Sequence, residues 1–104
     1  MRIVAVTACA AGIAHTYMAA ESLQKAAKEA GHDIKVEIQG SMGMENRLSQ
    51  ADIDAADVVI WAVDIHVREA DRFNKKSVFE VGPHEAIVNA LGAIETAKKE
   101  AGIS

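Results

Sequence analysis

The sequence predicts a small α/β domain: an open sandwich in which a four-stranded parallel sheet is covered by helices on both faces. Two observations support this fold class. Short apolar runs alternate with helical patterns along the chain, and the connections between them are short. This alternation favours parallel strands joined by right-handed crossovers. The length of 104 residues fits one domain, so residues 1–104 are interpreted as a single unit.

Four apolar runs are predicted to form the strands. Residues 2–8 and 57–63 are almost continuously apolar, as expected of central strands that are covered on both faces. Residues 34–38 alternate apolar and polar side chains, which is typical of a half-exposed edge strand, and residues 77–81 form a shorter run. Because the most apolar strands belong in the middle, the strands, numbered along the chain, are predicted to lie in the order 2-1-3-4.

Helical patterns fill the gaps between these runs. Residues 14–30 predict a first helix that Gly31 ends. Its apolar stripe consists of Ala19, Leu23, Ala26 and Ala30. A short helix is predicted to begin at Ser49, whose hydroxyl caps it while Asp52 takes the third helical position. The last helix is predicted to run from about residue 83 to 101. Its buried face consists of Ile87, Leu91 and Ile94.

Composition excludes several classes of protein. The net charge of −4 argues against a nucleic-acid surface, and one cysteine excludes a disulfide framework or a zinc finger. His32, His66 and His84 show no metal-ligand spacing, so neither metal nor cofactor is predicted. No apolar run is long enough to span a membrane, and the run before Cys9 is too short for a signal peptide. The protein is therefore expected in the cytoplasm.

The predicted strand order places the ligand site after the first strand, where residues 9–16 lead into the first helix. Small residues there let backbone N–H groups close around an anion, and the helix dipole points to the same space. That environment favours the thiolate of Cys9. Cys9 is thus the candidate catalytic residue. The candidate phosphate-binding residues are Ala10, Ala11, Gly12, Ile13, Ala14, His15 and Thr16.

A cysteine in such a loop suggests two chemistries. Cysteine phosphatases carry Cys-x5-Arg, with the arginine forked onto phosphate oxygens, and an aspartate before a proline as general acid. Here His15 takes the arginine position, and Gly82 precedes Pro83, the one proline. A site with a nucleophile that can receive phosphate, but without the arginine and the general acid needed for hydrolysis, is typical of a phosphoryl carrier.

Most of the other candidate residues keep two interpretations. His15 either donates a hydrogen bond to phosphate or is a structural histidine, and Thr16 either caps locally or touches phosphate. Asp64 is interpreted as orienting a loop near the site, and Trp61 as a core residue. Gln39-Gly40-Ser41 either flanks the site or forms a simple turn. A basic cluster is interpreted as a solvated face or as a surface for an acidic partner. It consists of Arg68, Arg72, Lys75 and Lys76.

The first segment of the chain resembles a known family. Val4 to Cys9, followed by Gly12-Ile13-Ala14-His15-Thr16, closely resembles the fructose-type enzyme IIB domain of the bacterial sugar phosphotransferase system. The resemblance continues through Gln39-Gly40-Ser41 and residues 55–65, and it weakens after residue 73. It implies that Cys9 accepts a phosphoryl group from a histidine of enzyme IIA. It also implies that the group passes to a sugar held by the membrane enzyme IIC.

One departure from the family pattern lies inside the loop. The family usually reads Cys-Pro-Thr/Ser/Asn-Gly, whereas this chain has Cys9-Ala10-Ala11-Gly12. Ala10 gains a backbone N–H that proline lacks, and Ala11 offers no side-chain donor. This change is expected to affect the affinity for phosphate and the rate of transfer more than the role of Cys9. Two other functions stay open: a small cysteine-dependent phosphatase, and a non-catalytic regulator that binds an anion in the same loop.

Overall fold

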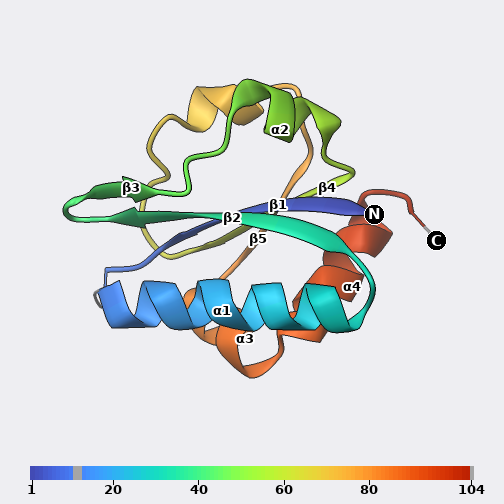
Figure 1. The fold of residues 1–104 in the computed structure, drawn as a ribbon, viewed down its shortest axis with the longest axis horizontal. Helices are drawn as coiled ribbons and strands as arrows, with labels where there is room; N and C mark the ends of the chain where they lie inside the picture. Colours follow the sequence, from blue (N-terminus) through green and yellow to red (C-terminus); the bar gives the residue numbers. More distant parts are fainter. Residues whose placement is uncertain (11–12, 104) are drawn as a thin grey trace.

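A five-stranded mixed sheet forms the centre of the computed structural model, which describes residues 1–10 and 13–103 (Figure 1). The elements in chain order are β1 (Arg2–Ala8), α1 (Ile13–Glu29), β2 (Asp33–Gly40), β3 (Gly43–Glu45), α2 (Gln50–Ala55), β4 (Val58–Val63), the 3-10 helix η1 (Ala70–Phe73), β5 (Val78–Val81), α3 (Pro83–Val88) and α4 (Ala90–Glu100). The helices α1, α3 and α4 cover one face of the sheet, and α2 and η1 cover the other.

The sheet corrects one part of the predicted architecture. Its order is β3-β2-β1-β4-β5, so the four expected strands are parallel and lie in the expected order. The prediction of a purely parallel, four-stranded sheet was wrong, because β3 adds a short antiparallel strand beside β2. Gly40 pairs with Gly43, and the two residues between them close a tight hairpin. Gly43 has a φ of 125°, which side chains disfavour, so glycine suits this position.

The apolar strands pack between two cores. The larger core joins β1, β2 and β4 to α1, α3 and α4, with Leu23 and Ile94 fully buried. The smaller core lies under α2 and η1, where Trp61 packs edge-on against Phe73 with ring centroids 5.4 Å apart. Trp61 is therefore partly buried against a core, as its place in an apolar run predicts. Burial on both faces explains why β1 and β4 read as nearly continuous apolar runs.

The first two helices follow their sequence signals closely. In α1, Ala19 and Leu23 are buried as expected, but the buried stripe ends at Ala27, and Ala30 is exposed because the helix has already ended at Glu29. Gly31 follows with a φ of 80°. At α2 the capping box is confirmed: Ser49 Oγ accepts from the N–H of Asp52 at 3.0 Å, and Asp52 Oδ2 accepts from the N–H of Ser49 at 3.1 Å.

The C-terminal helix is divided in two. The prediction of one helix over residues 83–101 was wrong, because the chain leaves helical geometry at Asn89, with φ −146° and ψ 57°. The Asn89 side chain accepts a hydrogen bond from the N–H of Gly92 at 3.2 Å and so starts α4. The break rotates the second half of the pattern, which leaves Leu91 51% exposed instead of buried.

The Asn89 cap yields a prediction on stability. Asn89→Ala removes the side-chain acceptor and is expected to lower the free energy of unfolding by about 1 kcal/mol. For a domain of this size the midpoint of thermal unfolding then falls by about 4–8 °C. Asn89→Asp, which keeps an acceptor oxygen, serves as the control. An unchanged or higher midpoint in the alanine variant would show instead that α3 and α4 gain by joining into one helix.

The helices also bear on membrane insertion. Over residues 1–10 and 13–103, none of them is both long enough and apolar enough to cross a bilayer.

Candidate functional site

The central strand of the sheet positions Cys9. This residue directly follows β1, and β1 lies between β2 and β4. The chain crosses to one side of β1 to form β2 and later returns to the other side to form β4. This reversal of strand order is where open α/β sheets bind ligands, beyond the carboxyl ends of the strands. Cys9 is 8% exposed, so it lies just beneath the surface at that position.

Among the described residues, the side chains of His15 and Asp64 contact the sulfur of Cys9. His15 Nδ1 lies 3.1 Å from Sγ, and the thiol donates a longer hydrogen bond of 3.5 Å to Oδ2 of Asp64. The other carboxylate oxygen, Asp64 Oδ1, accepts a hydrogen bond of 2.8 Å from the backbone N–H of Ala10. A thiol, an imidazole and a carboxylate thus form one connected cluster at the end of the central strands.

Local structure explains how these groups meet. His15 lies in the first turn of α1, which begins at Ile13, so the helix start directs its ring toward the end of β1. Asp64 follows β4, and its backbone N–H donates to the carbonyl of Ala8 at 3.2 Å. That bond continues the pairing of β1 with β4 by one residue and brings Asp64 beside Cys9. Asp64 therefore lies beside the candidate site, as expected, and its carboxylate holds the backbone N–H of Ala10.

The structure places the remaining candidate residues as follows. Ala11 and Gly12, which the sequence assigns to the phosphate loop, lie outside the described residues. Ile13 opens α1, and Ala14 is exposed one position later. Thr16 is only 2% exposed. Within the part of the chain that the structure describes, no three His, Cys, Asp or Glu side chains are grouped so that they could hold a metal ion.

A buried ion pair near the site was not foreseen from the sequence. Glu37 was expected on the exposed face of an edge strand, but its side chain is fully buried and receives both arms of the Arg72 guanidinium, at 2.8 and 2.9 Å. Arg72 was assigned to a solvated basic cluster, yet its side chain is only 9% exposed. Both expectations were wrong for these two residues, because η1 with Arg72 and the chain at Leu48 cover this part of β2.

This pair belongs to a larger hydrogen-bond network. Burial alone raises the pKa of Glu37, but hydrogen bonds from Arg72, from Gln39 and from the N–H of Leu48 outweigh it and hold this pKa below the ordinary value. The Glu37 carboxylate in turn raises the pKa of Arg72. Gln39 also binds the backbone of Arg68 twice: its Oε1 accepts from the N–H at 2.8 Å, and its Nε2 donates to the carbonyl at 3.0 Å. The network ties the segment after Asp64 to β2.

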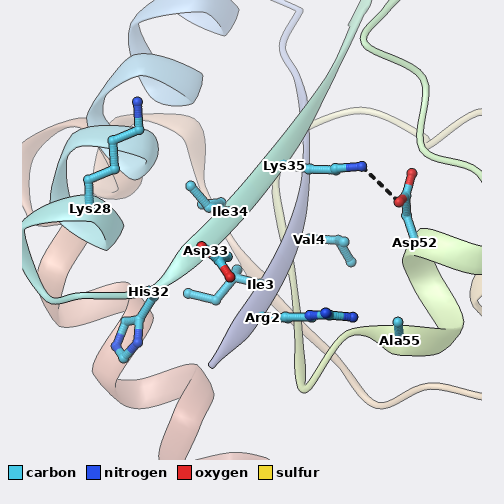
Figure 2. Close-up of a pocket in the computed structure, with 10 residues that line it drawn as sticks. All are labelled: Arg2, Ile3, Val4, Lys28, His32, Asp33, Ile34, Lys35, Asp52 and Ala55. Carbon is cyan, nitrogen blue, oxygen red and sulfur yellow. Dashed lines mark hydrogen bonds and ion pairs between the residues drawn. The ribbon is translucent and has the colours of Figure 1, made fainter.

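Two cavities lie at opposite ends of the sheet. One of about 650 Å³ begins at Asp64 and extends over Trp61, His66 and Glu80. The other, of about 530 Å³, lies where β1 and β2 begin (Figure 2). In the second cavity Lys35 forms an ion pair of 2.9 Å with Asp52, and hydrogen bonds from Lys35 and Ser49 lower the pKa of Asp52 to about 2. Of these two cavities, the one of about 650 Å³ adjoins the candidate site, because Asp64 lines it.

Fold and site together define a class: a small α/β domain with a cysteine at the reversal point of its sheet. The family model described as "PTS system, Lactose/Cellobiose specific IIB subunit" matches residues 4–101. The chain therefore belongs to this family, the IIB subunits of the sugar phosphotransferase system.

Relatives with known names agree with this assignment. The chain is 48% identical over 89 residues to the PTS system fructose-like EIIB component 2 of Escherichia coli K12, covering 86% of this chain and 84% of that one. It is 50% identical over 104 residues to the fructose-specific EIIB'BC component of Xanthomonas campestris, covering 98% of this chain but 17% of that longer protein. The resemblance to fructose-type IIB domains is thus confirmed, although the family model itself names lactose and cellobiose.

Solved structures show the same fold. The solution structure of an enzyme IIB subunit of the PTS system from Escherichia coli K12 superimposes with a TM-score of 0.89 at 39% identity, covering 97% of this chain and 94% of that one. A crystallised domain of a fructose-specific IIABC component from Borrelia burgdorferi gives a TM-score of 0.86 at 42% identity, covering 94% and 93%.

Proposed function

We propose that this protein is a phosphoryl carrier that accepts phosphate on Cys9 from enzyme IIA and passes it to a fructose-like sugar held by enzyme IIC. The observation that carries the proposal is the 3.1 Å contact between Cys9 Sγ and His15 Nδ1 beside the start of α1. Residues 1–104 act as one IIB domain, with residues 10–16 as the phosphate loop. The domain works in the cytoplasm at the inner face of the membrane.

The first half-reaction transfers the phosphoryl group to sulfur. His15 Nδ1 takes the proton of the Cys9 thiol, which leaves a thiolate beside an imidazolium. The thiolate attacks the phosphorus of the enzyme IIA phosphohistidine, so the N–P bond breaks, the S–P bond forms and the imidazole of enzyme IIA leaves. The positive charge on His15 and the backbone N–H groups of the loop stabilise the phosphoryl oxygens.

The second half-reaction returns the sulfur to its starting state. A sugar hydroxyl on enzyme IIC loses its proton to a base of enzyme IIC and attacks the same phosphorus, so the O–P bond forms and the S–P bond breaks. The leaving thiolate of Cys9 then takes back the proton of the His15 imidazolium. The names of the relatives support these partners: the Xanthomonas relative is a "EIIB'BC component", and the Borrelia domain comes from a "iiabc component". Their fructose names likewise support a fructose-like sugar for this chain.

A direct experiment tests acceptance of the phosphoryl group. The protein is incubated with phosphoenolpyruvate, the general phosphotransferase proteins and a fructose-type enzyme IIA, and its intact mass is measured. One added phosphoryl group per chain is expected, and omission of enzyme IIA should prevent its appearance. A protein that binds inorganic phosphate in the loop but never gains the covalent group would be a regulator instead.

The phosphatase alternative leads to a second prediction. The carboxylate of Asp64 lies close enough to Cys9 to be considered as a general acid, but His15 offers at most one donor where phosphatases use a forked arginine. We therefore expect negligible turnover of an aryl phosphate by the native protein. His15→Arg should bind phosphate more tightly and remain a poor phosphatase. Steady, Cys9-dependent hydrolysis by the unmodified protein would favour the hydrolase.

A further inference from the structure

The carboxylate of Asp64 contacts the two groups that the proposed function assigns to phosphate. Oδ1 accepts from the Ala10 N–H at 2.8 Å, and Oδ2 lies 3.5 Å from Cys9 Sγ. The oxygens of a phosphoryl group on Sγ reach the same space, because only an S–P and a P–O bond separate them from the sulfur. A carboxylate and a phosphoryl group are both anions that seek backbone N–H donors. They therefore compete for the Ala10 N–H.

We propose that the carboxylate of Asp64 competes with the phosphoryl group on Cys9 for the backbone N–H of Ala10. This carboxylate occupies the Ala10 N–H in the unphosphorylated protein and is displaced when Cys9 is phosphorylated. The proposal rests on the proposed function and adds a role for a residue outside the phosphate loop. The reason for displacement is charge. Two like charges about 4 Å apart repel enough to shift an equilibrium about 5-fold in bulk water and about 1,000-fold at the effective dielectric constant near a protein surface. Because Asp64 is exposed, the shift expected here lies near the lower limit, at about 10-fold.

The surroundings of Asp64 let its side chain turn away while the backbone stays in place. Asp64 is exposed and borders the cavity of about 650 Å³, which offers the carboxylate room and water. Its backbone N–H is held by the carbonyl of Ala8 at 3.2 Å, and four residues later the N–H of Arg68 is held by Gln39 at 2.8 Å. With the segment anchored at both points, the movement is a rotation of one side chain.

Competition of this kind makes phosphorylated Cys9 a better donor of its phosphoryl group. The Asp64 charge raises the free energy of the phosphorylated state, while the contacts to Ala10 and Cys9 lower that of the unphosphorylated state. Both effects favour release of the phosphoryl group to the next acceptor. Asp64 thus acts as a positioning residue that sets how readily the group leaves, and it exchanges no proton or phosphorus itself.

Binding of inorganic phosphate tests the competition without any phosphoryl transfer. Phosphate is titrated into ¹⁵N-labelled wild type, Asp64→Asn and Asp64→Ala, and the amide shift of Ala10 is followed. Both variants are expected to bind phosphate about 10-fold more tightly than wild type. Asp57→Asn is the matched control, because Asp57 is also exposed and accepts from a backbone N–H, that of Arg2, at 2.8 Å but at the opposite end of the sheet. Weaker binding by both Asp64 variants would overturn the proposal.

The exchange equilibrium with enzyme IIA provides a second readout. Asp64→Asn is expected to shift this equilibrium about 10-fold toward the phosphorylated form and to slow transfer to sugar, whereas Asp57→Asn leaves it unchanged. A merely structural role for Asp64 would lower labelling instead. If Asp64→Asn is labelled with an unchanged equilibrium, the competitor role is wrong and the carrier function stands. If no form of the protein is labelled, the carrier function fails, and the phosphate titration still decides whether Asp64 competes.

Discussion

Cys9→Ser is expected to abolish acceptance of the phosphoryl group from enzyme IIA. The serine hydroxyl ionises far less readily than a thiol, so the nucleophile that the proposed mechanism requires is lost. We expect the rate of labelling to fall by about three orders of magnitude or more. Intact-mass measurement over a time course checks this, with phosphoenolpyruvate and the general phosphotransferase proteins supplying the group.

The fold should survive this substitution, which makes the result interpretable. Serine differs from cysteine by one atom, and Cys9 lies at the end of β1 with 8% of its surface exposed. The midpoint of thermal unfolding is therefore expected to stay close to that of wild type. A second control, His84→Ala, removes an exposed histidine on α3 and should leave labelling intact. Undiminished labelling of the serine variant would place the phosphoryl group on another residue and contradict the assignment to Cys9.

Arg72→Met is expected to cause the largest loss of stability among the substitutions considered. It leaves the fully buried Glu37 carboxylate without the two guanidinium hydrogen bonds, of 2.8 and 2.9 Å, that compensate its burial. Breaking a buried pair from one side costs about 3–5 kcal/mol. Domains of this kind have about 5–15 kcal/mol in total, so the variant approaches the limit of folding. Urea unfolding at neutral pH measures the difference.

A matched substitution separates burial from the mere loss of an arginine. Arg47 pairs with Glu69 on the surface, where the two side chains are 54% and 45% exposed. Arg47→Met removes the same type of side chain from a solvated ion pair, and we expect it to cost about 0–1 kcal/mol. Equal costs for both variants would mean that the Glu37–Arg72 pair contributes no more than a surface pair.

The pH dependence of stability should change with the same substitution. In the native protein the pKa of Glu37 lies below its ordinary value of 4.5, so its contribution is complete above pH 4.5 and is lost as the pH falls through the lower folded-state pKa. Without Arg72, burial dominates and the pKa of Glu37 rises. Protonation of Glu37 then relieves the buried charge. The stability gap between variant and wild type should therefore begin to narrow above pH 4.5 and should narrow further as the pH falls through the lowered pKa of Glu37 in wild type. A gap that is constant from pH 7 to pH 4 would contradict this account.

The order of the four parallel strands and the position of Cys9 could be predicted from the sequence alone. Strand order follows from which runs are apolar on both faces, and helix ends follow from Gly31 and from the capping box at Ser49. Cys9 could be assigned to the reversal point of the sheet because it directly follows the central strand. All of these signals lie within a few residues of the feature they determine, so a linear reading finds them.

The sequence did not predict which polar groups meet. Strand β3 has three residues, too few for an alternating pattern, and the break at Asn89 interrupts a pattern that would also suit one continuous helix. Glu37 meets an arginine 35 residues away, and Cys9 meets a carboxylate 55 residues away. Such pairs depend on how strands and loops pack in three dimensions. The physical reason is that periodicity reports which face of an element is buried, whereas the partner of a buried or clustered charge is set by contacts between distant elements.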